Sequence, residues 1–185
     1  MSEKYHVSWL LDKVAKGAQP KYIFFWGHKT ELACTSKSCL SQWWPAPFTV
    51  GELTYPTAEH WMMVKKADLF DNANLIPKIL ANPEPGAAKA LGRKVTGFDQ
   101  KIWNAAKFDL VVQGSIHKFC QNPDIGDFLM GTGGRILVEA SPVDRIWGIG
   151  MDQNHPDIDN PALWKGENLL GFALMTARDQ VEPIW

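Results

Sequence analysis

The chain has 185 residues and a formal net charge of −1 at pH 7. That length fits one domain with a sizeable core, and the near-zero charge argues against an unspecific nucleic-acid or membrane binder, because such proteins carry a large basic excess. An odd number of cysteines without C-x-x-C spacing indicates neither a disulfide framework nor a zinc site. The N-terminal stretch is interrupted by charge too often for a signal peptide, so we expect a cytosolic protein.

The first third of the chain is predicted to alternate short elements with polar loops. Residues 5–17 have the pattern of a short amphipathic helix, and residues 22–26 form an aromatic-rich strand candidate that stops at Gly27. Residues 29–41 are polar and predict a surface loop. The segment 48–55 places a Gly-Glu pair between two β-prone triplets, which predicts a small hairpin.

The rest of the chain is predicted to be mainly helical. Helices are expected at residues 58–70, within 71–85, at 86–91, at 98–121, at 124–130 and at 168–181. Strands are expected at residues 135–140 and 146–151, and an Asp/Asn/Pro-rich loop at 152–161. Helices with few short strands predict an α+β fold, a single compact and mainly helical domain.

The stretch 54–66, TYPTAEHWMMVKK, predicts a helix entry that carries chemical groups. Thr57 is the candidate N-cap, which places Glu59 in the first turn near the positive end of the helix dipole. Lys66 follows Glu59 by seven residues, about two turns, so both side chains project from one side of the helix. The alternative is structural: Glu59 complements the dipole and Lys66 is solvated.

Charge is segregated along the second half of the sequence. Residues 89–118 contain six Lys or Arg against two acids, whereas residues 119–160 contain two against seven. If these segments meet across a cleft, the phosphate and the reactive sugar of a ligand have separate binding places. The alternative is two ordinary solvated faces.

Several motifs, in this order, resemble the NADAR family, also called YbiA-like. They are FFWGH (24–28), LSQWWPAPF (40–48), TYPTAEHW (54–61), GR (92–93), TG (132–133), VEASPVDRIWGIG (138–150) and GENLLG (166–171). The resemblance runs from about residue 22 to residue 178. It implies a domain at residues 22–182, a compact and largely helical α+β fold, and an N-terminal extension at residues 1–21 that is expected to hold the short helix.

The resemblance implies an N-glycosidase that hydrolyses the bond between an amine nitrogen and C1 of a ribose. The substrate is either a phosphoribosylated intermediate of riboflavin synthesis or guanine carrying ADP-ribose, free or in nucleic acid. No metal and no organic cofactor is implied, and His28 and His60 lack a second ligand at customary spacing. The rival functions are a non-catalytic reader of ADP-ribose or a modified nucleotide, and a purely structural interaction domain.

Cleavage of a ribosyl C1–N bond develops positive charge on the sugar and needs a proton for the departing amine. Within the matching motifs we take Glu59 and Asp144 as the candidate acids, with Glu59 the principal group. Lys66 is the third candidate catalytic residue. It either holds a phosphate or hydroxyl by charge, or attacks C1 of a ring-opened sugar to form a Schiff base.

The candidate substrate-binding residues are aromatic, cationic or glycine. Arg93 and Arg145 suit phosphate oxygens, with surface ion pairs as the alternative. Trp103 and Trp147 suit stacking on a base, with core packing as the rival for Trp103. The full set taken from the matching motifs and their surroundings is Trp26, Gly27, His28, Trp43, Arg93, Trp103, Arg145, Trp147 and Gly148.

Overall fold

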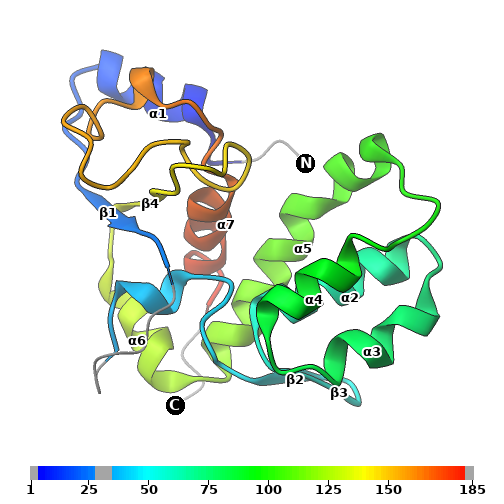
Figure 1. Cartoon of the computed structure of the whole chain (residues 1–185). Helices are drawn as coiled ribbons and strands as arrows, with labels where there is room; N and C mark the ends of the chain where they lie inside the picture. The colour runs from blue at the N-terminus through cyan, green and yellow to red at the C-terminus, as the bar shows by residue number, and fades with distance from the viewer. Residues whose placement is uncertain (1–3, 28–34, 182–185) are drawn as a thin grey trace.

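The computed structural model describes residues 4–27 and 35–181, and its order of elements confirms the predicted α+β class (Figure 1). The helices are α1 (Val7–Ala15), α2 (Ala58–Leu69), α3 (Ile76–Leu80), α4 (Pro85–Gly92), α5 (Gln100–Cys120), α6 (Pro123–Gly131) and α7 (Leu169–Arg178). The strands are β1 (Tyr22–Phe25), β2 (Phe48–Val50), β3 (Leu53–Tyr55) and β4 (Ile136–Glu139). Short 3-10 turns lie at Lys37–Leu40, Ala73–Leu75 and Pro161–Leu163.

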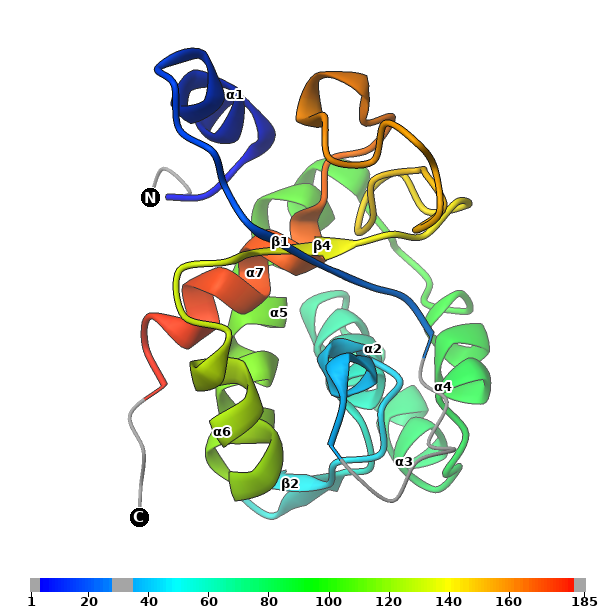
Figure 2. The same ribbon diagram turned by 90° about the vertical axis from the view of Figure 1, so that its left-hand side faces the viewer.

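The strands form two separate pairs. β1 and β4 run parallel, with Tyr22 beside Ile136 and Phe25 beside Glu139, while β2 and β3 form the predicted antiparallel hairpin. Figure 2 shows β1 and β4 crossing in front of α7. Because β4 is buried against α7, its Ile-Leu-Val run is continuous and apolar rather than alternating.

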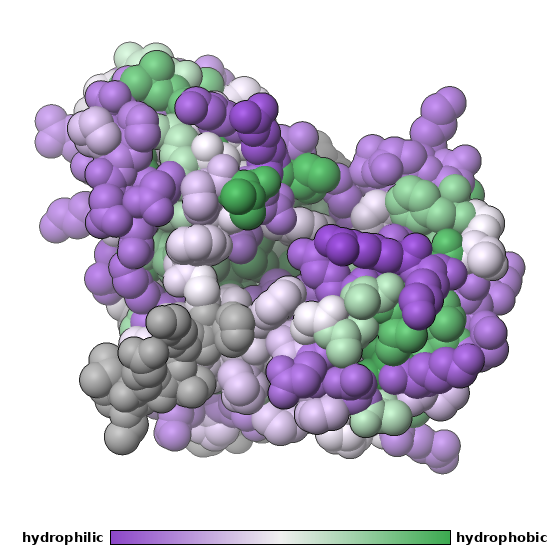
Figure 3. Space-filling view, viewed as in Figure 1, coloured by the Kyte–Doolittle hydropathy of each residue, from purple (hydrophilic) through white to green (hydrophobic). Residues whose placement is uncertain are grey.

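The helices form the bulk of the core. The long helix α5 begins where the side chain of Asp99 accepts hydrogen bonds from the backbone N–H groups of Lys101 and Ile102. It packs against α7 on one side and α2 on another, and α2 in turn packs against α4. Figure 3 shows a largely hydrophilic face with a depression between the part around α1 and the part around α2–α4.

The prediction of a strand at residues 146–151 is wrong. The side-chain Oδ1 of Asp144 accepts hydrogen bonds from the backbone N–H groups of Ile146 and Trp147, both at 2.8 Å, and so closes a turn. Gly148 then lies against the chain itself, because a Cβ there would sit 2.9 Å from the carbonyl oxygen of Glu139. The apolar residues of this segment are therefore those of a loop that packs into the core, and no strand forms there.

This loop caps the last helix. The carbonyl oxygens of Ile146 and Trp147 accept hydrogen bonds from the N–H groups of Leu169 and Leu170, which are first-turn donors of α7 without a partner inside the helix. Asn168, the residue before α7, has the left-handed backbone conformation with φ 54° and ψ 33°. The turn at 144–148 and the start of α7 are therefore one unit.

The first turn of α7 lies almost in contact with β4. A Cβ built at Gly171 would overlap the carbonyl oxygen of Leu137, which belongs to a fixed strand. We expect Gly171→Ala to lower the free energy of unfolding by about 3 kcal/mol, because backbone cannot move aside as a flexible side chain does. Urea unfolding followed by circular dichroism measures the change.

The matched control is Gly131→Ala at the end of α6, where a Cβ would meet nothing within 4 Å. That variant is expected to unfold at the midpoint of the unaltered protein or slightly above it. Equal loss of stability in both variants would contradict the importance of the contact between α7 and β4.

Candidate active site

A small cavity of about 60 Å³ lies where α2, α4, β4 and the start of α7 meet. Its lining combines acids, one cation, two indoles and an amide: Ser41, Gln42, Trp43, Glu59, Met62, Lys89, Glu139, Asp144, Trp147 and Leu170. Trp43, Glu59, Asp144 and Trp147 are sequence candidates that the fold brings together here. Gln42, Lys89 and Glu139 are polar lining residues that the sequence analysis did not select.

Glu59 lies at the start of α2, as predicted. The Thr57 side chain caps the helix, and the Glu59 backbone N–H donates to the carbonyl oxygen of Gln42 at 3.0 Å. Its side chain is only 2% exposed, and Oε2 accepts a hydrogen bond from Trp43 Nε1 at 3.2 Å. Burial raises the pKa of Glu59 to about 7, although Lys89 and the Trp43 hydrogen bond oppose that shift.

Glu139 is the last residue of β4 and lines the same cavity as Glu59. Burial raises its pKa to about 8, and the nearby charges of Asp144 and Glu59 act in the same direction. Within residues 4–27 and 35–181, the buried side-chain polar atoms that lack a hydrogen-bond partner are Gln42 Nε2, Glu59 Oε1 and Glu139 Oε2. All three residues line this one cavity, which is the arrangement expected of a ligand site.

Asn168 fixes the position of Glu139. Its side-chain Oδ1 accepts a hydrogen bond from the Glu139 backbone N–H at 3.0 Å, and its Nδ2 donates to the carbonyl oxygen of Leu137 at 2.9 Å. The Asn168 backbone N–H also donates to the carbonyl oxygen of Gly148 at 3.2 Å. One buried amide thus joins β4, the Asp144 loop and α7.

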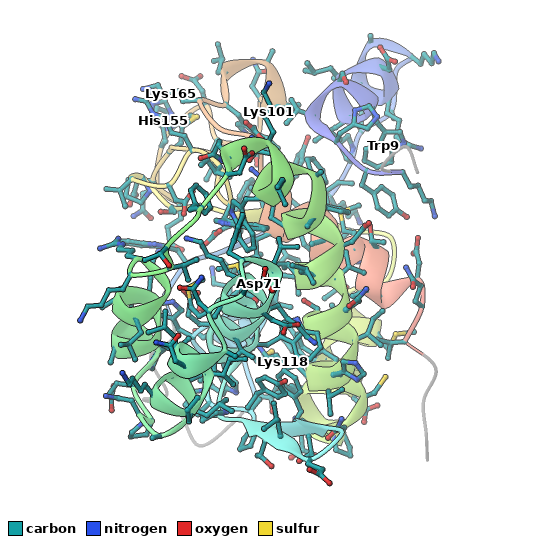
Figure 4. The ribbon with its side chains drawn as sticks, turned by 90° about the vertical axis from the view of Figure 1, so that its right-hand side faces the viewer. Trp9, Asp71, Lys101, Lys118, His155 and Lys165 are labelled. Atoms are coloured by element: carbon teal, nitrogen blue, oxygen red, sulfur yellow. The ribbon has the colours of Figure 1, made fainter. Side chains whose placement is uncertain are left out.

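A buried lysine fixes the segment that carries Gln42 and Trp43. Lys118 of α5 is fully buried, and its amine donates to the carbonyl oxygens of Cys39 at 2.6 Å and Ser41 at 2.8 Å (Figure 4). Burial lowers the pKa of Lys118 to about 7. The two carbonyl acceptors satisfy an amine that otherwise would be isolated in the core.

Lys66 and Trp103 lie together, but outside the set of residues that line the cavity. The Lys66 amine is 4.4 Å from the ring centroid of Phe98 and 5.7 Å from that of Trp103. Burial and the charge of Arg93 lower the pKa of Lys66. The charge of Arg93, an exposed residue, also lowers the pKa of Glu59, so it acts on both groups. The roles proposed for Lys66 remain predictions.

Three further candidates, Trp26, Gly27 and Arg145, are not among the residues that line the cavity. Trp26 and Gly27 follow β1 at the end of the strand pair that carries Glu139, and Trp26 is 49% exposed. His28 lies outside the described residues. Arg145 is exposed and its side chain packs beside Gly150. These positions remain predicted ligand contacts.

The charge segregation of the sequence has a counterpart at the cavity. Lys89 from the basic segment lines it together with Glu139 and Asp144 from the acidic segment. The Lys89 amine is 5.8 Å from the centroid of the Trp43 ring. Among the residues that the structure describes, no group of three or more His, Cys, Asp or Glu is placed to hold a metal ion. No helix in the same part of the chain is long and apolar enough to cross a membrane.

Comparison with known proteins gives consistent matches. The family model for the NADAR domain matches residues 24–182. An N-glycosidase of Acanthamoeba polyphaga mimivirus is 40% identical over 86% of this chain and 96% of its own length. An N-glycosidase of Nostoc punctiforme is 31% identical over 79% of this chain and 86% of its own length.

Two further matches concern pathway and fold. A chloroplastic riboflavin biosynthesis protein of Zea mays is 30% identical over 69% of this chain, which corresponds to 20% of that protein. The NMR structure of Escherichia coli YbiA superimposes with a TM-score of 0.69 at 25% identity, covering 88% of this chain and 86% of that one.

The raised pKa of Glu59 predicts a pH-dependent stability difference. Because the pKa is higher in the folded protein, about 7 against 4.5, folding favours the protonated carboxyl, and that stability is lost as the pH rises through this window. The side chain of Glu59→Gln stays neutral at every pH. The free energy of unfolding of this variant, relative to that of the unaltered protein, is therefore expected to rise from pH 5 to pH 8, by about 3 kcal/mol at most.

Urea unfolding at intervals between these pH values measures the difference. Glu52→Gln is the matched control, because Glu52 is exposed at the β2–β3 turn. A difference between Glu59→Gln and the unaltered protein that stays constant from pH 5 to pH 8 would contradict a buried, titrating carboxyl.

Proposed function

The chain belongs to the NADAR family, and we propose that it cleaves the bond between an amine nitrogen and C1 of a ribose. It is a hydrolase of N-glycosyl bonds, as its relatives of 40% and 31% identity are named to be. One observation carries the finer proposal: the buried carboxyl of Glu59 has an oxygen, Oε1, that meets no protein partner and borders the cavity.

Glu59 suits the stabilisation of a ribosyl cation. Its carboxylate form is supported by the Trp43 N–H and by the positive charges of Lys89 and Arg93. Loss of the amine leaves positive charge shared by C1 and the ring oxygen, and a fixed carboxylate in a water-poor cavity stabilises that charge more strongly than solvent does. The same oxygen then accepts a proton from the attacking water.

The size of the cavity supports a ligand that extends beyond it. A volume of 60 Å³ is far below the roughly 300 Å³ of ordinary ligand pockets, so only the reacting end of a sugar and its water can lie inside. Lys89 lines the cavity, and the charge of Arg93 acts on both Glu59 and Lys66. Trp103 offers an aromatic ring beside Lys66. A phosphate group and a flat base suit these surroundings.

Two substrate classes share that chemistry. One is guanine carrying ADP-ribose, as a nucleoside or in nucleic acid, and the other is a phosphoribosylated intermediate of riboflavin synthesis. The riboflavin class is supported by the relative in Zea mays, which is named for that pathway. Both present a ribose, an amine-bearing heterocycle and phosphate to the same residues.

The first test offers ADP-ribosylated guanosine and a phosphoribosylaminopyrimidine side by side and identifies the products by mass spectrometry. We expect release of the free amine and a reducing ribose derivative from at least one of them. Glu59→Gln keeps the size and hydrogen-bonding capacity of the side chain but removes its charge, so kcat is expected to fall by about 10²- to 10³-fold.

Binding of the intact substrate to Glu59→Gln, measured by calorimetry, is expected to change little. Product formation at the original rate would remove Glu59 from the mechanism. Tight binding of either compound by the unaltered protein without any cleavage would favour the rival function, a reader of ADP-ribose or of a modified nucleotide.

Lys66 is expected to contribute to turnover, because both of its candidate roles need the amine. Lys66→Gln should lower kcat/KM by at least about tenfold, an effect typical of a lost charged contact. Borohydride added during turnover distinguishes the roles: added mass at Lys66 assigns the Schiff base, and its absence assigns the charge contact. Full activity in Lys66→Gln would exclude both roles, and Lys78→Gln on α3 is the control.

A further inference from the structure

The departing amine needs a proton, and Asp144 is poorly arranged to supply it. Its Oδ1 already accepts the N–H groups of Ile146 and Trp147, both at 2.8 Å, and its own N–H donates to the Ser141 hydroxyl at 3.1 Å. These contacts engage the carboxylate as an acceptor and hold the loop in its turn. Asp144 therefore shapes the site and adds negative charge to it.

Glu139 differs from Asp144 in its side chain, which keeps a buried oxygen free of such contacts. Its side chain ends in the cavity with Oε2 buried and without a hydrogen-bond partner. Its backbone is fixed at both sides, because its N–H donates to Asn168 Oδ1 and its carbonyl oxygen accepts the N–H of Ile149 at 2.9 Å. A rigid strand end thus aims an uncommitted carboxyl at the place where the ligand reacts.

We propose that Glu139 is a catalytic residue, the acid that delivers a proton to the nitrogen as the C1–N bond breaks. The inference rests on the proposed N-glycosidase function and adds to it the source of the proton. Glu59 and Glu139 then divide the work of two-carboxylate glycoside hydrolysis: Glu59 faces the cation and the water, and Glu139 faces the leaving group.

The charges around the two carboxyls support this division. Glu59 has the N–H of Trp43 as a donor and is influenced by both Lys89 and Arg93, all of which favour its ionised form. Around Glu139, the charges of Asp144 and Glu59 favour the protonated form, and Lys89 opposes them. Two carboxyls whose surroundings separate their pKa values are suited to acid and base roles.

The proton balance of the step closes within the pair. The C1–N bond breaks with both electrons going to nitrogen, which takes the proton of Glu139 and leaves it as a carboxylate. Water attacks C1 and gives one proton to Glu59, which becomes neutral. Transfer of that proton from Glu59 to Glu139, directly through water in the cavity or by exchange with solvent, restores both groups.

The test compares Glu139→Gln with the unaltered protein on the substrate that the product analysis identifies. The variant cannot donate a carboxyl proton, so kcat should fall by about 10²- to 10⁴-fold while KM stays within a few-fold. The unaltered protein should lose activity as the pH rises through about 8, and this alkaline decline should be absent from the residual activity of Glu139→Gln. Glu139→Asp keeps a carboxyl, so part of the alkaline loss of activity should be seen again in that variant.

Glu167→Gln is the matched control, because Glu167 is exposed and lies two residues before α7. Its backbone N–H donates to the carbonyl oxygen of Arg145, and among the described residues its side chain has no hydrogen-bond partner. Infrared spectroscopy gives a readout that needs no turnover: a protonated-carboxyl band that disappears in Glu139→Gln and titrates near pH 8. Unchanged kcat in Glu139→Gln, or an alkaline decline that persists in it, overturns the proposal. Absence of any product from the unaltered protein overturns the proposed function instead.

Discussion

The hydrogen bonds of the buried Asn168 amide hold the site together. The side-chain amide donates to the carbonyl oxygen of Leu137 and accepts from the N–H of Glu139, so it pairs with the edge of β4 as a neighbouring strand would. The backbone N–H of Asn168 donates to the carbonyl oxygen of Gly148. Because the turn that contains Asp144 also caps α7, the position of Glu139, the Asp144 loop and the start of the helix depend on one another. A left-handed φ of 54° at Asn168 is a local strain that asparagine tolerates better than most residues.

The carboxyls that line the cavity suit the proposed function but lower the stability of the folded protein. Two carboxyls, the buried Glu59 and the partly buried Glu139, line one small cavity, and burial raises both pKa values. Each has an unsatisfied buried oxygen, and such groups lower the stability of the folded protein unless a ligand or water meets them. The apolar packing of the surrounding core opposes that loss.

Local sequence patterns predict the correct elements where the signal is strong. The Thr57 cap, the hairpin at 48–55 and the long helix α5 follow from capping, turn chemistry and helical spacing, which act within a few residues. The apolar segment 146–151 predicts a strand, but its residues form a loop that is turned by Asp144. Glu139 is absent from the candidate residues of the sequence analysis. The signal that could have identified it is an acid at the end of an apolar strand, inside a matching motif.

By itself the sequence determined the α+β class, the family resemblance and Glu59 in the first turn of a helix beside an indole-rich segment, because these depend on residue types and short spacings. Only the tertiary structure decided that Glu139 and Lys89 join Glu59 at one cavity while Lys66 lies beside Phe98 and Trp103. Packing of α2, α4, α7 and β4 brings together residues that are far apart in the chain. The pKa of a carboxyl such as Glu139 depends on its burial and on the charges near it in the folded protein, and its place in the sequence does not reveal either.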